Sequence, residues 1–129
     1  MTAARQRVGR RGEDAAAQEL CRGGWRLVAR NARVPGIRGE LDIVAVDPGG
    51  ELVIVEVKTL SAGNLAGPAS PLELVGPRKR AQLRRLAGAW VEAHRGRVRS
   101  ARGLRIDVVG VRLALGGRVR SLEHVRAAC

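Results

Sequence analysis

The alternation of hydrophobic and polar positions along the chain predicts a mixed α/β fold. Apolar residues recur at near-helical spacing over residues 3–22 and again from Gly76-Pro77 to about residue 94, so both segments are predicted helices. Shorter runs rich in Val, Ile and Leu, bounded by Gly and Pro, predict strands. The predicted strands cover residues 25–31, 40–47, 51–59, 104–115 and 118–125. The segments 34–38 and 61–71 are predicted loops, because Gly and Pro interrupt both patterns.

Two neighbouring strands in this pattern carry charges where the rest of the pattern is apolar. The first contains Gly39-Glu40-Leu41-Asp42 and the second contains Glu56-Val57-Lys58. Moving an unpaired carboxylate out of water is costly. Charged residues in such strands therefore need a partner or serve a function.

The turn between these strands, Pro48-Gly49-Gly50, predicts how they pair. A three-residue loop pairs Val46 with Leu52, Val44 with Ile54, Asp42 with Glu56, and Glu40 with Lys58. Side chains directly opposite each other have Cβ atoms about 5 Å apart. Asp42 and Glu56 would then repel each other unless a cation lay between them, and a hard divalent ion suits such oxygen ligands. A slip of one residue would move Asp42 to the other face of the sheet.

Asp42 followed by Glu56-Val57-Lys58 resembles the PD-(D/E)xK nuclease signature of restriction-endonuclease-like folds, with Leu41 where the signature has proline. A wider ordered set covers nearly the whole chain: Gly9, Gly12, Glu13, Ala16, Leu20, Asn31, Arg33, Gly39, Glu40, Gly67, Lys79 and the run 105–109. Together these motifs resemble the YraN-like family of small bacterial endonuclease-like proteins, which is similar in fold to archaeal Holliday junction resolvases. The resemblance implies a mixed central sheet flanked by helices, of the restriction-endonuclease-like type.

The resemblance also implies a metal-dependent nuclease that cuts nucleic acid. Asp42 and Glu56 would hold Mg²⁺ or Mn²⁺, with the Val57 carbonyl as a further ligand. Lys58 would orient the attacking water or stabilise charge in the transition state. Glu13 would complete the site from the first helix, directly or through water.

Each of these residues also has a purely structural interpretation. Glu13 could be a solvated helix carboxylate paired with an arginine, and Asp42 and Glu56 could belong to a structural ion network. Lys58 could simply neutralise Glu40. We otherwise expect Glu40 to support the metal ligands without contacting the metal itself. Asp107 lies in an apolar strand, and we interpret it as a structural carboxylate that accepts backbone hydrogen bonds.

The charge of the chain indicates a polyanionic partner. The net charge is +12, although an arginine-rich composition alone would also give this excess. Only two of the 24 basic residues are lysines, Lys58 and Lys79, and both occupy motif positions. Lys79 could contact a phosphate or be a solvated helix residue. Nucleic acid, with DNA favoured, is expected to contact Arg78, Lys79, Arg80, Arg84 and Arg85, together with the connector 95–102.

Length and composition bear on the number of domains, the cellular location and zinc binding. The 129 residues fit one endonuclease-like domain, 1–129. Two cysteines and no apolar leader indicate a cytoplasmic protein, and no apolar run predicts a membrane span. Cys21 is expected in the core, while His94 and His124 lack the spacing of a zinc site.

Three functions stay open: an active nuclease, a catalytically silent nucleic-acid-binding module, and a subunit of a DNA-processing complex. A homodimer is expected only by analogy with resolvases.

Overall fold

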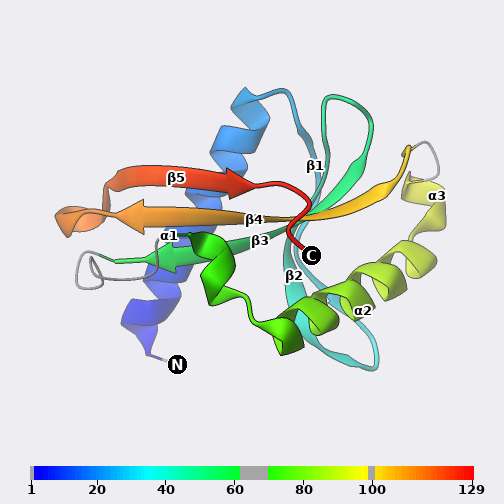
Figure 1. Cartoon of the computed structure of the whole chain (residues 1–129), viewed down its shortest axis with the longest axis horizontal. Coiled ribbons are helices and arrows are strands. Elements are labelled where there is room, and N and C mark those ends of the chain that lie inside the picture. The colour runs from blue at the N-terminus through cyan, green and yellow to red at the C-terminus, as the bar shows by residue number, and fades with distance from the viewer. Residues whose placement is uncertain (1, 62–69, 99–100) are drawn as a thin grey trace.

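A five-stranded mixed sheet forms the centre of the part of the protein that the computed structural model describes, residues 2–61, 70–98 and 101–129. The strands follow chain order across the sheet: β1 (Arg26–Val34), β2 (Ile37–Val46), β3 (Leu52–Leu60), β4 (Leu104–Leu113) and β5 (Val119–Val125). Strands β3 and β4 run parallel, whereas the other neighbours are antiparallel. Helices flank this sheet (Figure 1), which confirms the mixed α/β architecture of restriction-endonuclease-like type.

The two long helices form where the sequence predicts them. Helix α1 (Ala3–Arg22) begins after Thr2, whose side chain accepts the Arg5 N–H, and Gly23 caps its end. Helix α2 (Pro77–Ala93) starts with proline at its first turn, where no N–H is needed. It belongs to the crossover between β3 and β4, together with the short helices η2 (Pro71–Leu74) and α3 (Arg95–Val98). No helix in the described residues is long and apolar enough to cross a membrane.

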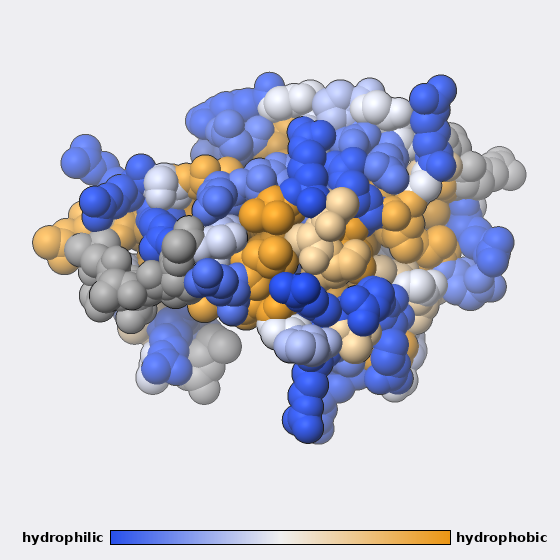
Figure 2. All heavy atoms as spheres, in the orientation of Figure 1, coloured by the Kyte–Doolittle hydropathy of each residue, from blue (hydrophilic) through white to orange (hydrophobic). Residues whose placement is uncertain are grey.

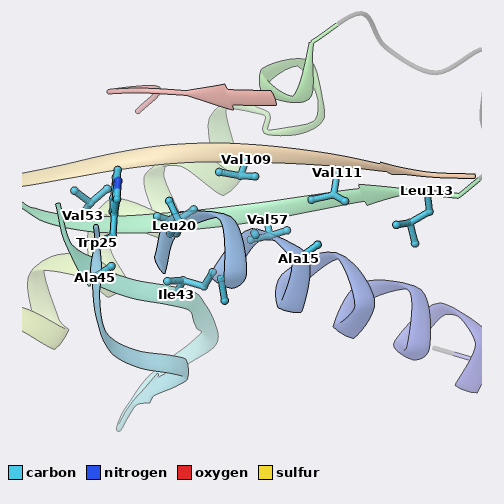
Figure 3. Close-up of a cluster of buried hydrophobic side chains, with 13 residues drawn as sticks. Ala15, Leu20, Trp25, Ile43, Ala45, Val53, Val57, Val109, Val111 and Leu113 are labelled. Carbon is cyan, nitrogen blue, oxygen red and sulfur yellow. The ribbon is translucent and has the colours of Figure 1, made fainter. Parts of the chain in front are cut away.

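Each long helix covers one face of the sheet with its own hydrophobic core. Figure 3 shows Ala15 and Leu20 of α1 among side chains from the sheet, including Ile43, Val57 and Val109. On the opposite face, α2 contributes the buried residues Leu83, Leu86, Ala87 and Trp90. Fully burying one aliphatic side chain of this size contributes about 1.5–3 kcal/mol. The two cores therefore fix both helices against the strands that carry the charged motif.

Two expectations about local structure need correction, and a third falls mostly outside the described residues. The predicted loop 34–38 shrinks to the turn Pro35-Gly36, because β1 extends to Val34 and β2 already starts at Ile37. Cys21 is exposed rather than buried, since it follows Leu20 by one position and so points to a different side of α1. Of the predicted loop 61–71, residues 62–69 lie outside the described residues.

The hairpin register is confirmed over part of its length. Val46 pairs with Leu52 and Val44 with Ile54, and the pairing continues to Ile43 and Val55. Beyond that point β2 and β3 no longer form backbone pairs, so neither Asp42 with Glu56 nor Glu40 with Lys58 pairs in the ladder. The Asp42 and Glu56 carboxylates still lie close enough to interact. Glu40 instead pairs with Arg33 of β1, in register and through an ion pair of 3.2 Å.

Candidate active site

Asp42 and Glu56 lie where β2 and β3 separate. Asp42 is half-buried, and the backbone N–H of Val57 donates to its Oδ2 at 2.8 Å. The Asp42 side chain accepts a backbone N–H of β3 that a main-chain carbonyl of β2 would accept in a continuous ladder. The backbone pairing of β2 and β3 ends next to it, at Ile43 and Val55. Glu56 is only 3% exposed, and its Oε1 has no hydrogen-bond partner within the described part of the chain. An orphaned buried carboxylate oxygen of this kind is costly, and it calls for a ligand.

The electrostatics of the two carboxylates agree with this geometry. Burial and then the nearby Glu56 carboxylate raise the pKa of Asp42 to about 8, against the lowering effect of the Val57 N–H. Two neighbouring buried carboxylates cannot both be charged without a compensating cation or proton. At neutral pH, therefore, the site holds either a proton on Asp42 or a positive group between the two acids.

Both lysines of the chain converge on Glu56. The Lys58 Nζ lies 3.1 Å and the Lys79 Nζ 3.5 Å from the same atom, Glu56 Oε2. Lys58 is on β3, two residues after Glu56, whereas Lys79 reaches the site from the first turn of α2. Both ammonium groups contact Oε2. The other oxygen, Oε1, has no hydrogen-bond partner among the described residues and remains available to a ligand.

Glu13 borders the same region from α1. Gly12 is buried, and a β-carbon there would clash with the Thr59 side chain, so glycine allows α1 to pack closely on β3. Glu13 is half-buried, and burial raises its pKa, opposed by Arg30 and supported by nearby carboxylates. Glu13 and Lys58 both line an open cleft of about 560 Å³ between α1 and the end of β3. Solvent can therefore reach Glu13 and Lys58 through this cleft.

Glu40 and the arginines of α2 lie at the margin of the site. Glu40 is ion-paired with Arg33, although its charge still acts on Glu13. Arg80 donates from Nε to the Val75 carbonyl at 2.9 Å, so that nitrogen is already satisfied. Exposed arginines on α2 are Arg78, Arg84 and Arg85.

The connector after α2 is largely occupied by internal contacts. Arg95 forms a bidentate pair with Glu92, at 2.7 and 3.0 Å. Arg97 donates to the Val28 carbonyl at 2.8 Å and also lies over the Trp90 ring. Residues 99 and 100 fall outside the described part of the chain. These contacts leave the α2 surface as the better candidate for phosphate contacts.

Asp107 belongs to a separate polar cluster, although in the parallel register it pairs with Val55, the residue before Glu56. Its fully buried carboxylate accepts from Arg105, from the Ala127 N–H at 2.9 Å, and lies 2.7 Å from His124 Nε2. Burial alone would raise its pKa, but the hydrogen bonds from His124, Arg105 and Ala127 lower it to about 2. Arg105 also binds Glu51 at 2.7 Å. The cluster is a satisfied internal network, as expected for a structural carboxylate.

The donor set at Asp42 and Glu56 fits a hard divalent cation. No group of three or more His, Cys, Asp or Glu side chains within residues 2–61, 70–98 and 101–129 is arranged to hold a metal ion. Magnesium, however, is usually bound by only one or two carboxylates, with water and substrate phosphate completing its shell. The orphaned Oε1 of Glu56 beside Asp42 supplies such a pair.

Two features of the site were missed in the sequence. The pairing of Lys79 with Glu56 depends on how α2 packs, although the scarcity of lysine pointed to its importance. Arg30, which acts on Glu13 and binds Asp14 at 2.8 Å, is one of many arginines, and no sequence signal distinguishes it.

Comparison with known proteins gives the family. Residues 12–111 match the family described as "Uncharacterised protein family UPF0102". The chain is similar to a UPF0102 protein of Clavibacter michiganensis subsp. michiganensis, with 47% identity over 125 residues, covering 96% of this chain and 97% of the relative. It is also similar to a UPF0102 protein of Moorella thermoacetica, with 41% identity over 128 residues and 99% of each chain covered. The protein therefore belongs to the UPF0102 family.

Proposed function

We propose that this protein is a Mg²⁺- or Mn²⁺-dependent endonuclease of the PD-(D/E)xK superfamily, similar to archaeal Holliday junction resolvases, that hydrolyses phosphodiester bonds in nucleic acid, with DNA favoured. One observation carries the proposal: a buried Glu56 with an unpartnered oxygen lies beside Asp42, whose pKa is raised to about 8, and both lysines converge on that glutamate. A buried carboxylate oxygen is nearly always hydrogen-bonded or bound to a cation, so this oxygen supports a ligand at the site.

Asp42, Glu56 and the Val57 carbonyl would hold the metal. A bound divalent ion polarises the scissile phosphate and lowers the pKa of an attacking water. The Val57 N–H keeps the Asp42 carboxylate oriented, because it donates to Oδ2. Burial keeps bulk water away from Glu56, which strengthens its interaction with a cation.

The charged side chains around the ligands each have a role in this proposal. Lys58 lines the open cleft, so its Nζ can donate to the attacking water or to a phosphate oxygen as charge develops. Lys79 reaches the same Glu56 oxygen from α2 and would neutralise the site until substrate phosphate arrives. Glu13, at the cleft with a raised pKa, would position water through its carboxyl group.

The exposed arginines of α2 would bind the phosphate backbone. Such contacts weaken as salt rises, because binding releases counterions. They carry no sequence information. The protein would therefore recognise nucleic acid by structure or without specificity, and not by base sequence. A homodimer remains a prediction by analogy with resolvases.

The second candidate is a catalytically silent nucleic-acid-binding module, or a subunit of a DNA-processing complex. It is favoured by the ion pairs themselves, since Lys58 and Lys79 already neutralise one oxygen of Glu56 without any metal. In that case the charged residues around Glu56 would only stabilise the fold, and the basic surface alone would bind nucleic acid.

A cleavage assay separates the two candidates. Duplex, single-stranded, flap and four-way-junction DNA would be incubated with wild type, Asp42→Asn and Glu56→Gln, with and without Mg²⁺ or Mn²⁺. We expect cleavage by wild type only with metal, none by either variant, and nearly unchanged DNA binding by all three. The control Glu92→Gln removes an exposed acid on α2 and should cleave normally. Equal cleavage by Asp42→Asn would contradict the proposed site, and metal-dependent binding without cleavage on every substrate would favour the silent module.

A further inference from the structure

The tip of the β4–β5 hairpin exposes an unusually large apolar surface. Leu115 is 87% exposed, compared with 45% for Leu104, the next most exposed large hydrophobic side chain in the described residues. Val119, which starts β5 beside the tip, is 39% exposed. A single exposed leucine is ordinary. This one, however, lies at the end of a hairpin and is accompanied by a second exposed apolar residue.

The backbone holds the tip rigidly. Gly116 and Gly117 both have φ above +80°, a left-handed conformation that other residues rarely adopt, and this tight turn leaves Leu115 outside the sheet. The Ala114 N–H donates to the Arg118 carbonyl at 2.7 Å, which closes the hairpin. Arg11 of α1 donates from Nε to the Gly117 carbonyl at 3.0 Å. The tip is thus fixed to the helix that carries Glu13, two residues after Arg11.

The residues around the tip carry positive charge, which suits a polyanionic partner. Between Val108 and Leu122 the sequence contains no acidic residue and three arginines, Arg112, Arg118 and Arg120. Figure 2 shows hydrophobic atoms at the left end of the molecule, where the hairpin ends, with hydrophilic side chains beside them. An apolar point among arginines suits nucleic acid, which offers phosphates outside and base faces inside.

The chain also lacks an exposed Phe, Tyr or Trp ring that could stack on a base. It has no Phe or Tyr, and both tryptophans are buried. Aliphatic side chains such as leucine serve as wedges between base steps in other nucleic-acid-binding proteins. Among the described residues, Leu115 is the large apolar side chain that is most free to act in this way.

The tip and the candidate active site are placed to act on one nucleic acid. In the parallel pair of β3 and β4, Lys58 pairs with Gly110 and Leu60 with Arg112, so the tip lies beyond the end of β3 on the side of the cleft. Leu115 follows Gly110 by five residues, or about 16 Å at roughly 3.3 Å per residue. This corresponds to about five nucleotides at about 3.4 Å each.

We propose that the β4–β5 tip is a wedge that inserts Leu115 between bases where a DNA duplex is interrupted by a branch or an unpaired end. The proposal rests on the proposed function, because it names the substrate class of that site. Opening a base step costs least where stacking is already disturbed. A rigid apolar wedge therefore binds interrupted duplexes better than continuous ones, without reading sequence.

The test measures binding and unstacking in EDTA, so that it does not depend on cleavage. Four-way-junction and flap DNA would carry 2-aminopurine next to the branch point, and continuous duplex would serve as the reference. For wild type we expect tighter binding to branched DNA and increased 2-aminopurine fluorescence. Leu115→Ala should lose the fluorescence change and bind branched DNA about tenfold more weakly, the loss expected when one aliphatic side chain no longer leaves water. Its affinity for continuous duplex should change little.

Two control variants make the result specific. Leu104→Ala removes another exposed leucine, at the start of β4, and should behave as wild type. Leu115→Met keeps an apolar side chain at the tip and should retain the preference for branched DNA. The wedge is overturned if Leu115→Ala binds branched DNA like wild type, or if it weakens both substrates equally. It is equally overturned if the substitution changes only self-association in sedimentation, which would make the tip a protein contact. A protein that never cleaves DNA can still pass this test, so the two proposals fail separately.

Discussion

The raised pKa of Asp42 predicts that removing its charge stabilises the metal-free protein at neutral pH. In the folded protein, burial and Glu56 raise this pKa from 3.8 to about 8. Between these values the folded state keeps a proton that the unfolded state releases. The free energy of unfolding therefore falls as pH rises, and this contribution to stability is fully present only below about pH 4. Asp42→Asn keeps the size of the side chain and its acceptor for the Val57 N–H, but it cannot titrate.

The magnitude follows from one proton. Each pH unit between 3.8 and about 8 costs the wild type about 1.4 kcal/mol relative to Asp42→Asn. From pH 5 to pH 7 the difference in unfolding free energy should grow by about 2.7 kcal/mol, and above about pH 8 it should level off. The amide of the variant can donate to Glu56 at every pH, in place of the hydrogen bond that wild-type Asp42 forms only while it is protonated.

Urea unfolding in EDTA at pH 5, 6, 7 and 8 measures this difference. Adding Mn²⁺ should narrow the difference at pH 7, because a ligand at one hundred times its dissociation constant stabilises the folded wild type by about 2.7 kcal/mol. Glu92→Gln, whose acid is exposed on α2, should follow the wild type at every pH. A difference between wild type and Asp42→Asn that does not change with pH would refute the reasoning, since Asp42 would then not be protonated beside Glu56.

Three further predictions concern the remaining charged groups. Lys58→Met should lower single-turnover cleavage by about 10²–10³, and Lys58→Arg by less, with DNA binding retained; a Lys58→Met rate equal to wild type would remove this residue from the mechanism. Neutralising Arg78, Arg84 and Arg85 should weaken binding to all sequences alike and lower the salt slope by about one unit per lost phosphate contact, whereas an unchanged slope would make the basic charge merely compositional. Asp107→Ala should cost about 3–5 kcal/mol in urea unfolding, because it removes the buried acceptor shared by Arg105, His124 and the Ala127 N–H; a loss below 1 kcal/mol would contradict the network's structural role.

The sequence predicted those parts of the fold that depend on local pattern. Both helices start and end near their expected residues, since capping residues and apolar spacing act over one or two turns. The hairpin register followed from Pro48-Gly49-Gly50 as far as Ile43. It failed at Glu40, because the competing partner, Arg33, lies on another strand that the hairpin pattern does not include.

The candidate site was predictable in its acids and less so in its lysines. Asp42 and Glu56 could be singled out because carboxylates in apolar strands are costly, whether they hold a metal or not. The contact between Lys79 and Glu56 joins residues on α2 and β3, and it exists only once the helix packs on the sheet. Likewise the exposure of Leu115 follows from the turn at Gly116 and Gly117, whereas the sequence placed this residue at the end of the predicted strand 104–115.

Calorimetric titration with Mn²⁺ at pH 7.5 tests the central claim most directly, because the claim is that Asp42 and Glu56 together form a metal site. The account predicts that wild type and Glu92→Gln bind Mn²⁺ with release of a proton from Asp42, seen as heat that depends on the buffer. Asp42→Asn and Glu56→Gln should bind at least tenfold more weakly, each having lost one carboxylate ligand. Equal affinity in Asp42→Asn, or no binding by the wild type with or without DNA, would contradict it.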